Sequence, residues 1–209
     1  MSNEYEFALL KEYSPAAVAQ IEAIYDKSFP REERKPFFYI ENALQRDHYH
    51  VFVMRRTSEQ KEIIAFSLMP SLRTSNAMYI EYYAVASELR GQGIGSVLFR
   101  ELVAYLKEKG STAIVWEVDP PKQVGDDNTR RIVFYERLGA HVIEGVPHYG
   151  MPNYFKGHDI IPFKLMWISL RDERSQPTKA ELITFIRDIY ETEYPGHDAQ
   201  RDEIIASLE

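Results

Sequence analysis

The sequence has 209 residues, of which 44% are hydrophobic and 27% are charged, so it can bury a full core as one domain, with or without an appendage. Its net charge of −7 argues against a general nucleic-acid binder, and the absence of cysteine excludes disulfides, thiolate metal sites and a cysteine nucleophile. Because no apolar run approaches the roughly 18 residues that span a bilayer, and the acidic N-terminus is unlike a signal peptide, we expect a cytoplasmic protein without a membrane partner.

The chain begins with a strand pattern and then two helix patterns. Residues 6–11 predict a strand. Ser14 followed by Pro15 predicts a helix start, because a capping side chain precedes proline at the first helical position. Phe29 and the proline after it end this helix, and residues 37–44 predict a second, short helix after a charged loop.

Residues 49–56 and 63–72 are rich in β-branched and aromatic side chains, and they predict two strands joined by a polar hairpin loop. His48 and His50 alternate onto one face of the first strand, which suggests a metal pair. Since no third ligand stands at a recognisable spacing, we expect both histidines to be structural or exposed and predict no metal site.

Residues 78–106 form the stretch around which the rest of the chain is organised. Its first half is strand-like, and its second half has apolar residues at helical spacing. Between the halves, Arg90-Gly91-Gln92-Gly93-Ile94-Gly95 makes a glycine-rich turn that opens directly into a helix. Small residues let the backbone approach a ligand, and the first N–H groups of a helix can bind an anion.

Three phosphate-binding patterns can be tested on this turn. A Walker A loop fails because Gly95 is followed by Ser96 and a valine, and the dinucleotide fingerprint fails because its sixth position, counted from Gly91, is also Ser96. The pattern Arg/Gln-x-x-Gly-x-Gly/Ala fits Arg90, Gly93 and Gly95 without a gap. This pattern between a strand and a long helix resembles the pyrophosphate-binding motif of the GNAT superfamily of acyl-CoA-dependent N-acyltransferases.

A second motif lies at the predicted helix over residues 129–138. Asn128, Arg131, Tyr135 and Gly139 are spaced as Asn-x-x-Arg-x-x-x-Tyr-x-x-x-Gly. This spacing resembles a second GNAT signature, which commonly has a small residue where Arg131 stands. The two motifs occur in the family's order with one strand between them, which makes the resemblance specific.

The remaining strands are predicted over residues 112–118, 140–144 and 163–170. Residues 145–162 form a long connection without periodicity between the last two of these strands. A loop of this length is usually functional or disordered, and its tyrosines and prolines argue against disorder. Beyond Arg171, a capping box at Thr178 and Glu181 precedes a helix with one apolar face.

The resemblance implies a mixed α/β fold, with a central, mostly antiparallel, V-splayed sheet of six to seven strands flanked by helices. It covers about residues 4–170. We therefore expect a GNAT-like domain at residues 1–170 and a C-terminal helical appendage at residues 171–209, packed on the domain or on a partner subunit, so that a homodimer is possible.

The resemblance also implies which residues hold acetyl-CoA as the acyl donor. Backbone groups of the central strand pair with the pantetheine arm, the amide of Val85 polarises the thioester, and the turn binds the pyrophosphate. The predicted cofactor-binding residues are Tyr83, Ala84, Val85, Arg90, Gly91, Gln92, Gly93, Ile94, Gly95, Ser96, Asn128 and Arg131.

For catalysis, the resemblance makes Tyr135 the acid that protonates the departing sulfur, with core packing as the alternative. The base is open between Glu81, which alternates with two tyrosines on the central strand, and Glu117 on the neighbouring strand, because a charge in an apolar strand is costly unless it is paired or faces a cleft. Either carboxylate could instead form an ion pair with Arg131 or Arg137.

The predicted function is transfer of an acetyl group to a primary amine, in a small molecule or a peptide, without a metal ion or nucleic acid. A cationic substrate suits the negative net charge. The alternative is a non-catalytic acyl-CoA-binding module that serves regulation. The residues expected to line the acceptor pocket are Phe29, Arg34, Phe37, Tyr149 and Tyr154.

Overall fold

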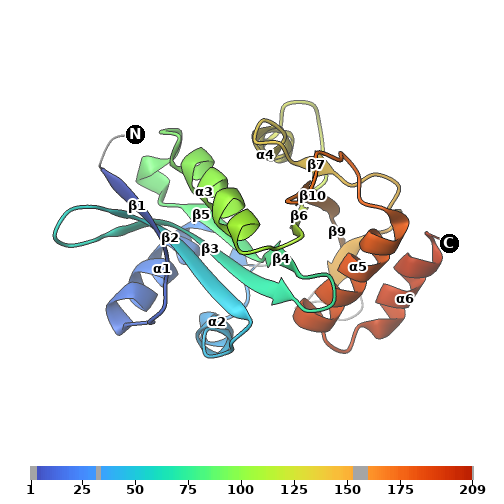
Figure 1. Cartoon of the computed structure of the whole chain (residues 1–209), viewed down its shortest axis with the longest axis horizontal. Coiled ribbons are helices and arrows are strands. Elements are labelled where there is room, and N and C mark those ends of the chain that lie inside the picture. The colour runs from blue at the N-terminus through green and yellow to red at the C-terminus, as the bar shows by residue number, and fades with distance from the viewer. Residues whose placement is uncertain (1–3, 32–33, 153–159, 209) are drawn as a thin grey trace. The chain divides into compact units, whose positions relative to one another are not determined.

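The computed structural model describes residues 4–31, 34–152 and 160–208 (Figure 1). The chain divides into two compact units: unit 1 is Met1–Ser71 with Ile80–Tyr105, and unit 2 is Leu72–Tyr79 with Leu106–Glu209. Both units combine mainly antiparallel strands with flanking helices, so the fold is mixed α/β, as the sequence predicts.

Unit 1 contains four neighbouring strands in the order β1 (Tyr5–Leu9), β2 (Tyr49–Arg56), β3 (Ile63–Leu72) and β5 (Tyr82–Val85). Each pairs with the next in antiparallel register. The predicted bounds of β2 and β3 are confirmed. Both strands are almost continuously buried, because helices cover both of their faces.

Alternation along the strands of unit 1 separates two apolar faces. Val53, Phe66 and Tyr82 belong to one core cluster with apolar residues of α1 (Pro15–Ser28) and α2 (Phe37–Ala43). Phe52 on the other face packs against Tyr105 of α3 (Ile94–Glu108), with ring centroids 5.4 Å apart. Residues of one strand thus reach opposite faces because their side chains alternate.

Helix α1 begins where the sequence predicts. The side chain of Ser14 accepts a hydrogen bond from the amide of Ala17 at 3.3 Å, and Pro15 is the first helical residue. The helix ends at Ser28, and Phe29 caps it in an extended conformation.

The central strand is interrupted, whereas the sequence pattern predicts simple alternation through Glu81. It breaks at Glu81 into β4 (Ala77–Ile80) and β5. The amide of Glu81 donates to the carbonyl of Leu68 at 3.0 Å while Tyr82 is also in register with Leu68, so two residues oppose one, as in a β-bulge. Simple alternation across Glu81 is therefore wrong.

Unit 2 contains the strand order β4, β6 (Ala113–Val118), β10 (Lys164–Ser169) and β7 (His141–Val142). Strands β6 and β7 both pair with β10 in antiparallel register. With the break at Glu81, the seven predicted strands become eight. The strand predicted at residues 140–144 shortens to the two residues of β7.

The connection predicted to lack regular structure contains a separate antiparallel hairpin of β8 (Gly150–Pro152) and β9 (Ile160–Pro162). A side chain at Gly150 would meet the carbonyl oxygen of Ile161 at 2.3 Å, so the two backbones approach closely because position 150 lacks a Cβ. The sequence missed this pairing because each strand has only three residues.

Helices α4 (Asp127–Glu136), α5 (Lys179–Glu193) and α6 (Asp198–Ala206) belong wholly to unit 2. Helix α4 begins two residues before its predicted start, because the side chain of Asp126 accepts a bond from the amide of Thr129 at 2.7 Å and caps the helix. Helix α5 begins at the predicted capping box, and α6 follows it.

Helix α5 shares a core with the strands of unit 2. Its buried face includes Phe185 and Ile189, which lie in one cluster with Val115, Leu165 and Trp167. The C-terminal segment is thus packed on β6 and β10, while the domain boundary near residue 170 stays a prediction.

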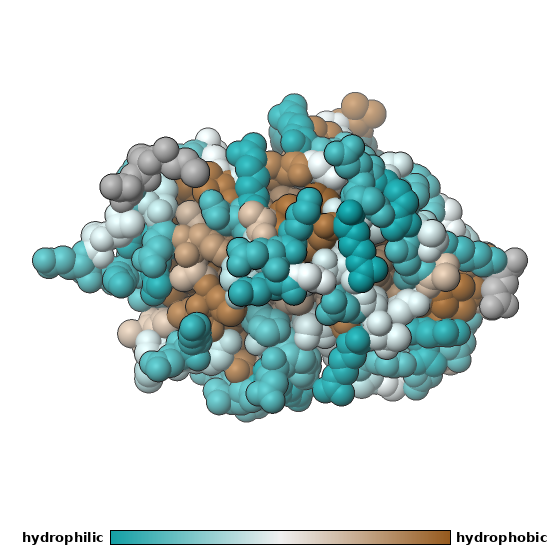
Figure 2. All heavy atoms as spheres, in the orientation of Figure 1, coloured by the Kyte–Doolittle hydropathy of each residue, from teal (hydrophilic) through white to brown (hydrophobic). Residues whose placement is uncertain are grey.

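The face shown in Figure 2 is mostly hydrophilic, with smaller hydrophobic patches. Among the residues that the structure describes, none of the helices combines the length and the apolar character needed to cross a bilayer.

Candidate active site

The glycine-rich turn of unit 1 leads from β5, through a 3₁₀ turn at Ser87–Leu89, into α3. Gly91 and Gly93 have φ angles of +77° and +82°, and a Cβ at either position would meet nothing within 4 Å. The first helical bond runs from the amide of Val97 to the carbonyl of Gly93 at 3.1 Å, so the amides of Ile94 to Ser96 precede it. The turn therefore offers helix-terminal donors beside open space.

Strand β5 has one paired edge. The amide of Ala86 donates to the carbonyl of Ile64 at 2.9 Å, and β5 runs antiparallel to β3. Because bonded pairs alternate in an antiparallel ladder, Ala84 bonds to β3, whereas Tyr83 and Val85 direct their backbone groups to the other edge. Among the described residues β5 pairs with no strand except β3, so that edge can accept an extended ligand.

Arg90 lies at the end of this edge. Its Nε donates to the carbonyl of Val85 at 3.2 Å, and an η nitrogen donates to the hydroxyl of Ser28 at 2.8 Å. Tyr83 donates its hydroxyl to the carbonyl of Gly95, which joins β5 to the first turn of α3. Both residues are exposed or half-buried and hold the turn in place.

Glu81 lies in a partly buried ion pair within unit 1. Its Oε1 accepts a bond from Nζ of Lys35 at 2.7 Å, and its Oε2 accepts one from the hydroxyl of Tyr49 at 2.7 Å. The side chain of Glu81 is 7% exposed and that of Lys35 is 21% exposed. The partner of Glu81 is thus Lys35, not Arg131 or Arg137.

Aromatic side chains surround this ion pair. Tyr25 donates its hydroxyl to the carbonyl of Lys35 at 3.0 Å, and burial raises the pKa of Tyr25 to about 12. Phe29 packs edge-on against Tyr82 at 5.0 Å, and Phe37 packs against Tyr25 at 5.6 Å. Phe29 and Phe37 therefore border the core of unit 1.

Arg34, the other predicted acceptor residue of unit 1, forms an ion pair with Asp26 of α1. Its side chain is 24% exposed. Its predicted contact with a substrate stays a prediction.

Glu117 of unit 2 has a different environment from Glu81. It stands in β6 between buried apolar residues and is half-buried itself. Its Oε2 accepts bonds from the hydroxyls of Tyr79 at 2.9 Å and Tyr194 at 2.5 Å, and its Oε1 accepts one from Tyr149 at 2.6 Å. Three tyrosine hydroxyls thus donate to this carboxylate.

The tyrosines around Glu117 have raised pKa values. Burial, and next the negative charge of Glu117, raise the pKa of Tyr79 well above its usual value, and the same two causes raise the pKa of Tyr149. Sequence reasoning assigned Tyr149 to the acceptor wall but missed Tyr79 and Tyr194 as partners of Glu117. No local pattern connects Tyr194 to a strand 77 residues before it.

Helix α4 places the second motif. Tyr135 is 6% exposed, and its ring lies 4.9 Å from that of Trp116. Burial raises the pKa of Tyr135, and the charge of Arg131 partly offsets this rise. Arg131 pairs with Asp119 at 2.8 Å, and the amide of the Asn128 side chain donates to a loop carbonyl at 3.1 Å, so both fasten the loop before the helix.

Comparison with known proteins shows the family of the chain. A family model described as "Acetyltransferase (GNAT) family" matches residues 18–140, which is more than half of the chain. The chain belongs to the acetyltransferase (GNAT) family. The matched residues include the glycine-rich turn, both carboxylates and the motif on α4.

Individual relatives extend the comparison. "Putative acetyltransferase YjbC" of Bacillus subtilis (strain 168) is 31% identical over 111 residues, which are 52% of this chain and 50% of YjbC, so the match spans about half the length of that relative. A solved structure, "Putative acetyltransferase from GNAT family" from Bacteroides thetaiotaomicron, is 24% identical, with a TM-score of 0.68 over 90% of this chain and 98% of the other.

An aminoglycoside 6'-N-acetyltransferase solved with coenzyme A is 16% identical, with a TM-score of 0.58 over 80% of this chain and 98% of the other. Because both solved structures are less than 25% identical to this chain, their similarity shows a shared fold and no more. Helices α5 and α6 lie beyond the segment that the GNAT model matches.

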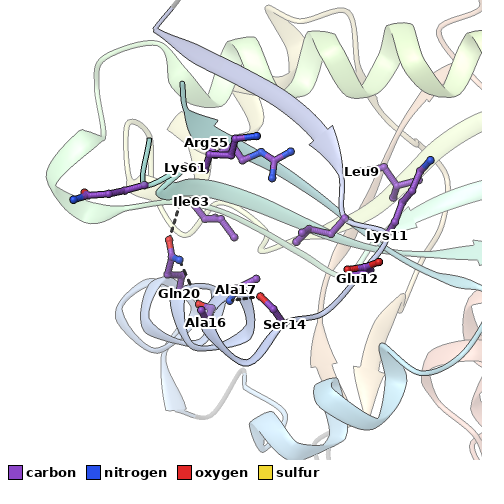
Figure 3. A pocket seen from close by; sticks show the side chains of 12 residues that line it. Leu9, Lys11, Glu12, Ser14, Ala16, Ala17, Gln20, Arg55, Lys61 and Ile63 are labelled. Atoms are coloured by element: carbon purple, nitrogen blue, oxygen red, sulfur yellow. Dashed lines mark hydrogen bonds between the residues drawn. The ribbon is translucent and has the colours of Figure 1, made fainter. Parts of the chain in front are cut away.

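Two surface pockets of this GNAT protein are lined by residues other than the predicted site residues. The larger, of about 520 Å³, is in unit 1 between the end of β1, the start of α1 and the hairpin of β2 and β3; Lys11, Ser14, Arg55 and Lys61 line it (Figure 3). The smaller, of about 250 Å³, is in unit 2 near Trp167 and α5. Among the described residues, no predicted site residue lines either pocket. Tyr154 lies outside the described residues.

Proposed function

We propose that the protein transfers an acetyl group from acetyl-CoA to a primary amine, by direct attack in a ternary complex. The observation that carries the proposal is in unit 1, where the turn at the start of α3 follows β5, a strand that pairs only with β3 among the residues that the structure describes. Open space beside Gly91 and Gly93 suits phosphate oxygens that approach the backbone.

The donor half of the proposal uses backbone groups. The amides of Ile94, Gly95 and Ser96 bind the pyrophosphate, because helix-terminal N–H groups favour an anion. The outward backbone groups of Tyr83 and Val85 pair with the pantetheine arm, and the amide of Val85 stabilises the negative charge on the thioester oxygen. Coenzyme A bound to a structure of similar fold supports this half.

The acceptor half uses side chains of unit 2. An alkylammonium with a pKa of about 10.4 must lose its proton before attack, and we assign Glu117 as the group that accepts it. The neutral amine then attacks, a new C–N bond forms as the C–S bond breaks, and the nitrogen loses its second proton while the departing thiolate takes one up. Because burial raises the pKa of Tyr135, its hydroxyl stays protonated at neutral pH and donates a hydrogen bond to the sulfur, with water replacing any proton it gives up.

Binding and turnover test the proposal separately. Calorimetry should show binding of acetyl-CoA, and a thiol assay with a panel of amines should show release of free coenzyme A that depends on the amine. Binding with no thiol release from any amine would identify a non-catalytic acyl-CoA-binding module instead. Absence of binding would overturn both functions.

The glycine-rich turn offers a matched pair of variants. Gly93→Val places a branched side chain beside the turn, so we expect acetyl-CoA affinity to fall by about tenfold or more. Gly110→Val is the control, since Gly110 also has a positive φ, +80°, and open surroundings but lies after α3. Equal affinity in a folded Gly93→Val variant would contradict the pyrophosphate assignment.

A further inference from the structure

Helix α5 contributes a side chain to the environment of a proposed catalytic group. Tyr194, which caps the C-terminal end of α5, donates its hydroxyl to Glu117 of β6 at 2.5 Å. The two residues are 77 positions apart, and Tyr194 lies outside the segment matched by the family model. A contact of this kind is not required by the family motifs.

Several features fix Tyr194 in this place. Its amide donates to the carbonyl of Tyr190 at 3.0 Å, which closes the last turn of α5 before a proline ends the helix. Tyr194 is 5% exposed, and its ring packs against that of Tyr190 with centroids 5.3 Å apart. A buried ring with few rotamers presents its hydroxyl at a defined point.

The C-terminal helices also hold the segment that carries Tyr149. Tyr190 donates its hydroxyl to the carbonyl of Gly150 at 2.7 Å, and the side-chain amide of Gln200 donates to the same oxygen at 3.1 Å. Tyr149, the preceding residue, donates to Glu117. Helices α5 and α6 therefore restrain Glu117 directly and also through Tyr149.

We propose that α5 and α6 are part of the acceptor half of the active site, and that Tyr194 is a positioning residue that orients the carboxylate of Glu117 toward the amine. This inference rests on the proposed function. Two hydroxyls on one oxygen and one on the other restrict rotation of the carboxylate, because each donor has its own direction. Hydrogen bonds to an ionised group are the stronger kind.

The competing explanation is that Tyr194 only attaches α5 to the strands. Asp188, also on α5, allows a control, because it is buried and accepts bonds from the amides of Thr74 and Ser75 and from the hydroxyl of Ser75, far along the chain from Glu117. Asp188→Asn weakens the attachment of α5 without removing a partner of Glu117. A purely structural Tyr194 should behave like Asp188.

The experiment compares Tyr194→Phe with Asp188→Asn in the full chain. We expect Tyr194→Phe to lower kcat about tenfold, the effect of losing one hydrogen bond to a charged group, with KM for acetyl-CoA unchanged. We expect the acidic limb of its pH–rate profile to move to higher pH, because the carboxylate loses a donor that stabilises its ionised form. Asp188→Asn should lower the melting temperature and leave the profile in place.

The pH profile reflects every titratable group around the carboxylate, and these groups are kept in both variants apart from the one replaced. Those that the structure describes include Tyr79 of β4, Tyr149 before β8, Tyr190 and Glu193 of α5, and Tyr194 at its C-terminal cap. Carbon-13 spectra of the tyrosine rings give a readout without turnover. The signals of Tyr79 and Tyr149 should shift in Tyr194→Phe and stay in place in Asp188→Asn.

The outcomes separate this inference from the proposed function. If the wild type is active and both variants have the same kcat and pH profile, Tyr194 is a structural residue and the inference is wrong. Unshifted tyrosine signals in Tyr194→Phe also overturn it. If the wild type releases no thiol with any amine, the proposed function itself fails.

Discussion

Glu81 and Glu117, the two carboxylates considered as the base, illustrate two ways to hold a negative charge within a folded protein. In unit 1, Glu81 is bound by the ammonium of Lys35 and by one tyrosine. In unit 2, Glu117 is bound by three tyrosine hydroxyls, which are neutral. A full positive charge at 2.7 Å stabilises a carboxylate and also neutralises it, whereas hydroxyls leave its net charge in place.

The different partners of Glu81 and Glu117 suggest different roles, one in stability and one in proton transfer. The ion pair with Lys35 weakens the attraction of Glu81 for a cationic amine, whereas the tyrosine hydroxyls that donate to Glu117 do not themselves cancel its charge. A tyrosine hydroxyl can both donate and accept a hydrogen bond, whereas a lysine ammonium can only donate. We therefore assign the proton acceptor to Glu117 and expect Glu81 to act through stability.

The largest effect should come from Glu117→Gln. The amide is nearly the same size but accepts no proton, so we expect kcat to fall about 10³-fold while acetyl-CoA affinity stays within about twofold. Steady-state kinetics with a fixed amine, alongside calorimetry, measures both. A variant with wild-type kcat would remove the distinction between the two carboxylates.

The next effect should be in stability, from Glu81→Gln. Glu81→Gln removes a counter-charge of Lys35 from a partly buried ion pair, so we expect the free energy of unfolding to fall by about 1–3 kcal/mol. Denaturant titration measures this, and kcat should change by less than about threefold. The double variant Lys35→Met with Glu81→Gln should recover part of the loss. If Glu81→Gln instead lowers kcat mainly at acidic pH, Glu81 is the base.

Tyr135→Phe separates removal of the amine's proton from stabilisation of the sulfur. It keeps the packing against Trp116 and deletes only the hydroxyl, so we expect kcat to fall about 10²-fold with unchanged acetyl-CoA affinity. An activated thioester with a better leaving group should recover much of the rate. Wild-type turnover would show that Tyr135 has only a packing role.

The smallest effect should appear at Glu181, a more exposed carboxylate in the capping box of α5. Hydrogen bonds from Arg174 lower its pKa from 4.5 to about 2. A lowered pKa stabilises the fold at pH values above 4.5, and this contribution is lost as the pH falls toward 2. With the side chain 35% exposed and screened, we expect Glu181→Gln to cost about 0.5–1 kcal/mol at pH 7.

Thermal unfolding of Glu181→Gln and wild type across this pH range tests the sign. The difference in melting temperature should shrink from pH 5 to pH 2, since protonation leaves the wild type with the same charge as the variant. A difference that grows at low pH would contradict the assignment.

The sequence by itself determined the features that depend on residues a few positions apart. The cap at Ser14, the capping box at Thr178 and the strand over residues 49–56 all follow from short-range spacing. The turn at Gly93 and the motif around Tyr135 are likewise local patterns. Each is set by backbone geometry within one or two turns.

Only the tertiary structure decided which groups meet across the chain. Lys35 and Glu81 are 46 residues apart, and Tyr194 and Glu117 are 77 apart. The bulge at Glu81 and the hairpin that begins at Gly150 likewise depend on pairing between distant segments. A side chain's partner over such distances is chosen by packing of whole elements, because the hydrophobic faces of helices and strands fix their positions before any single polar contact can.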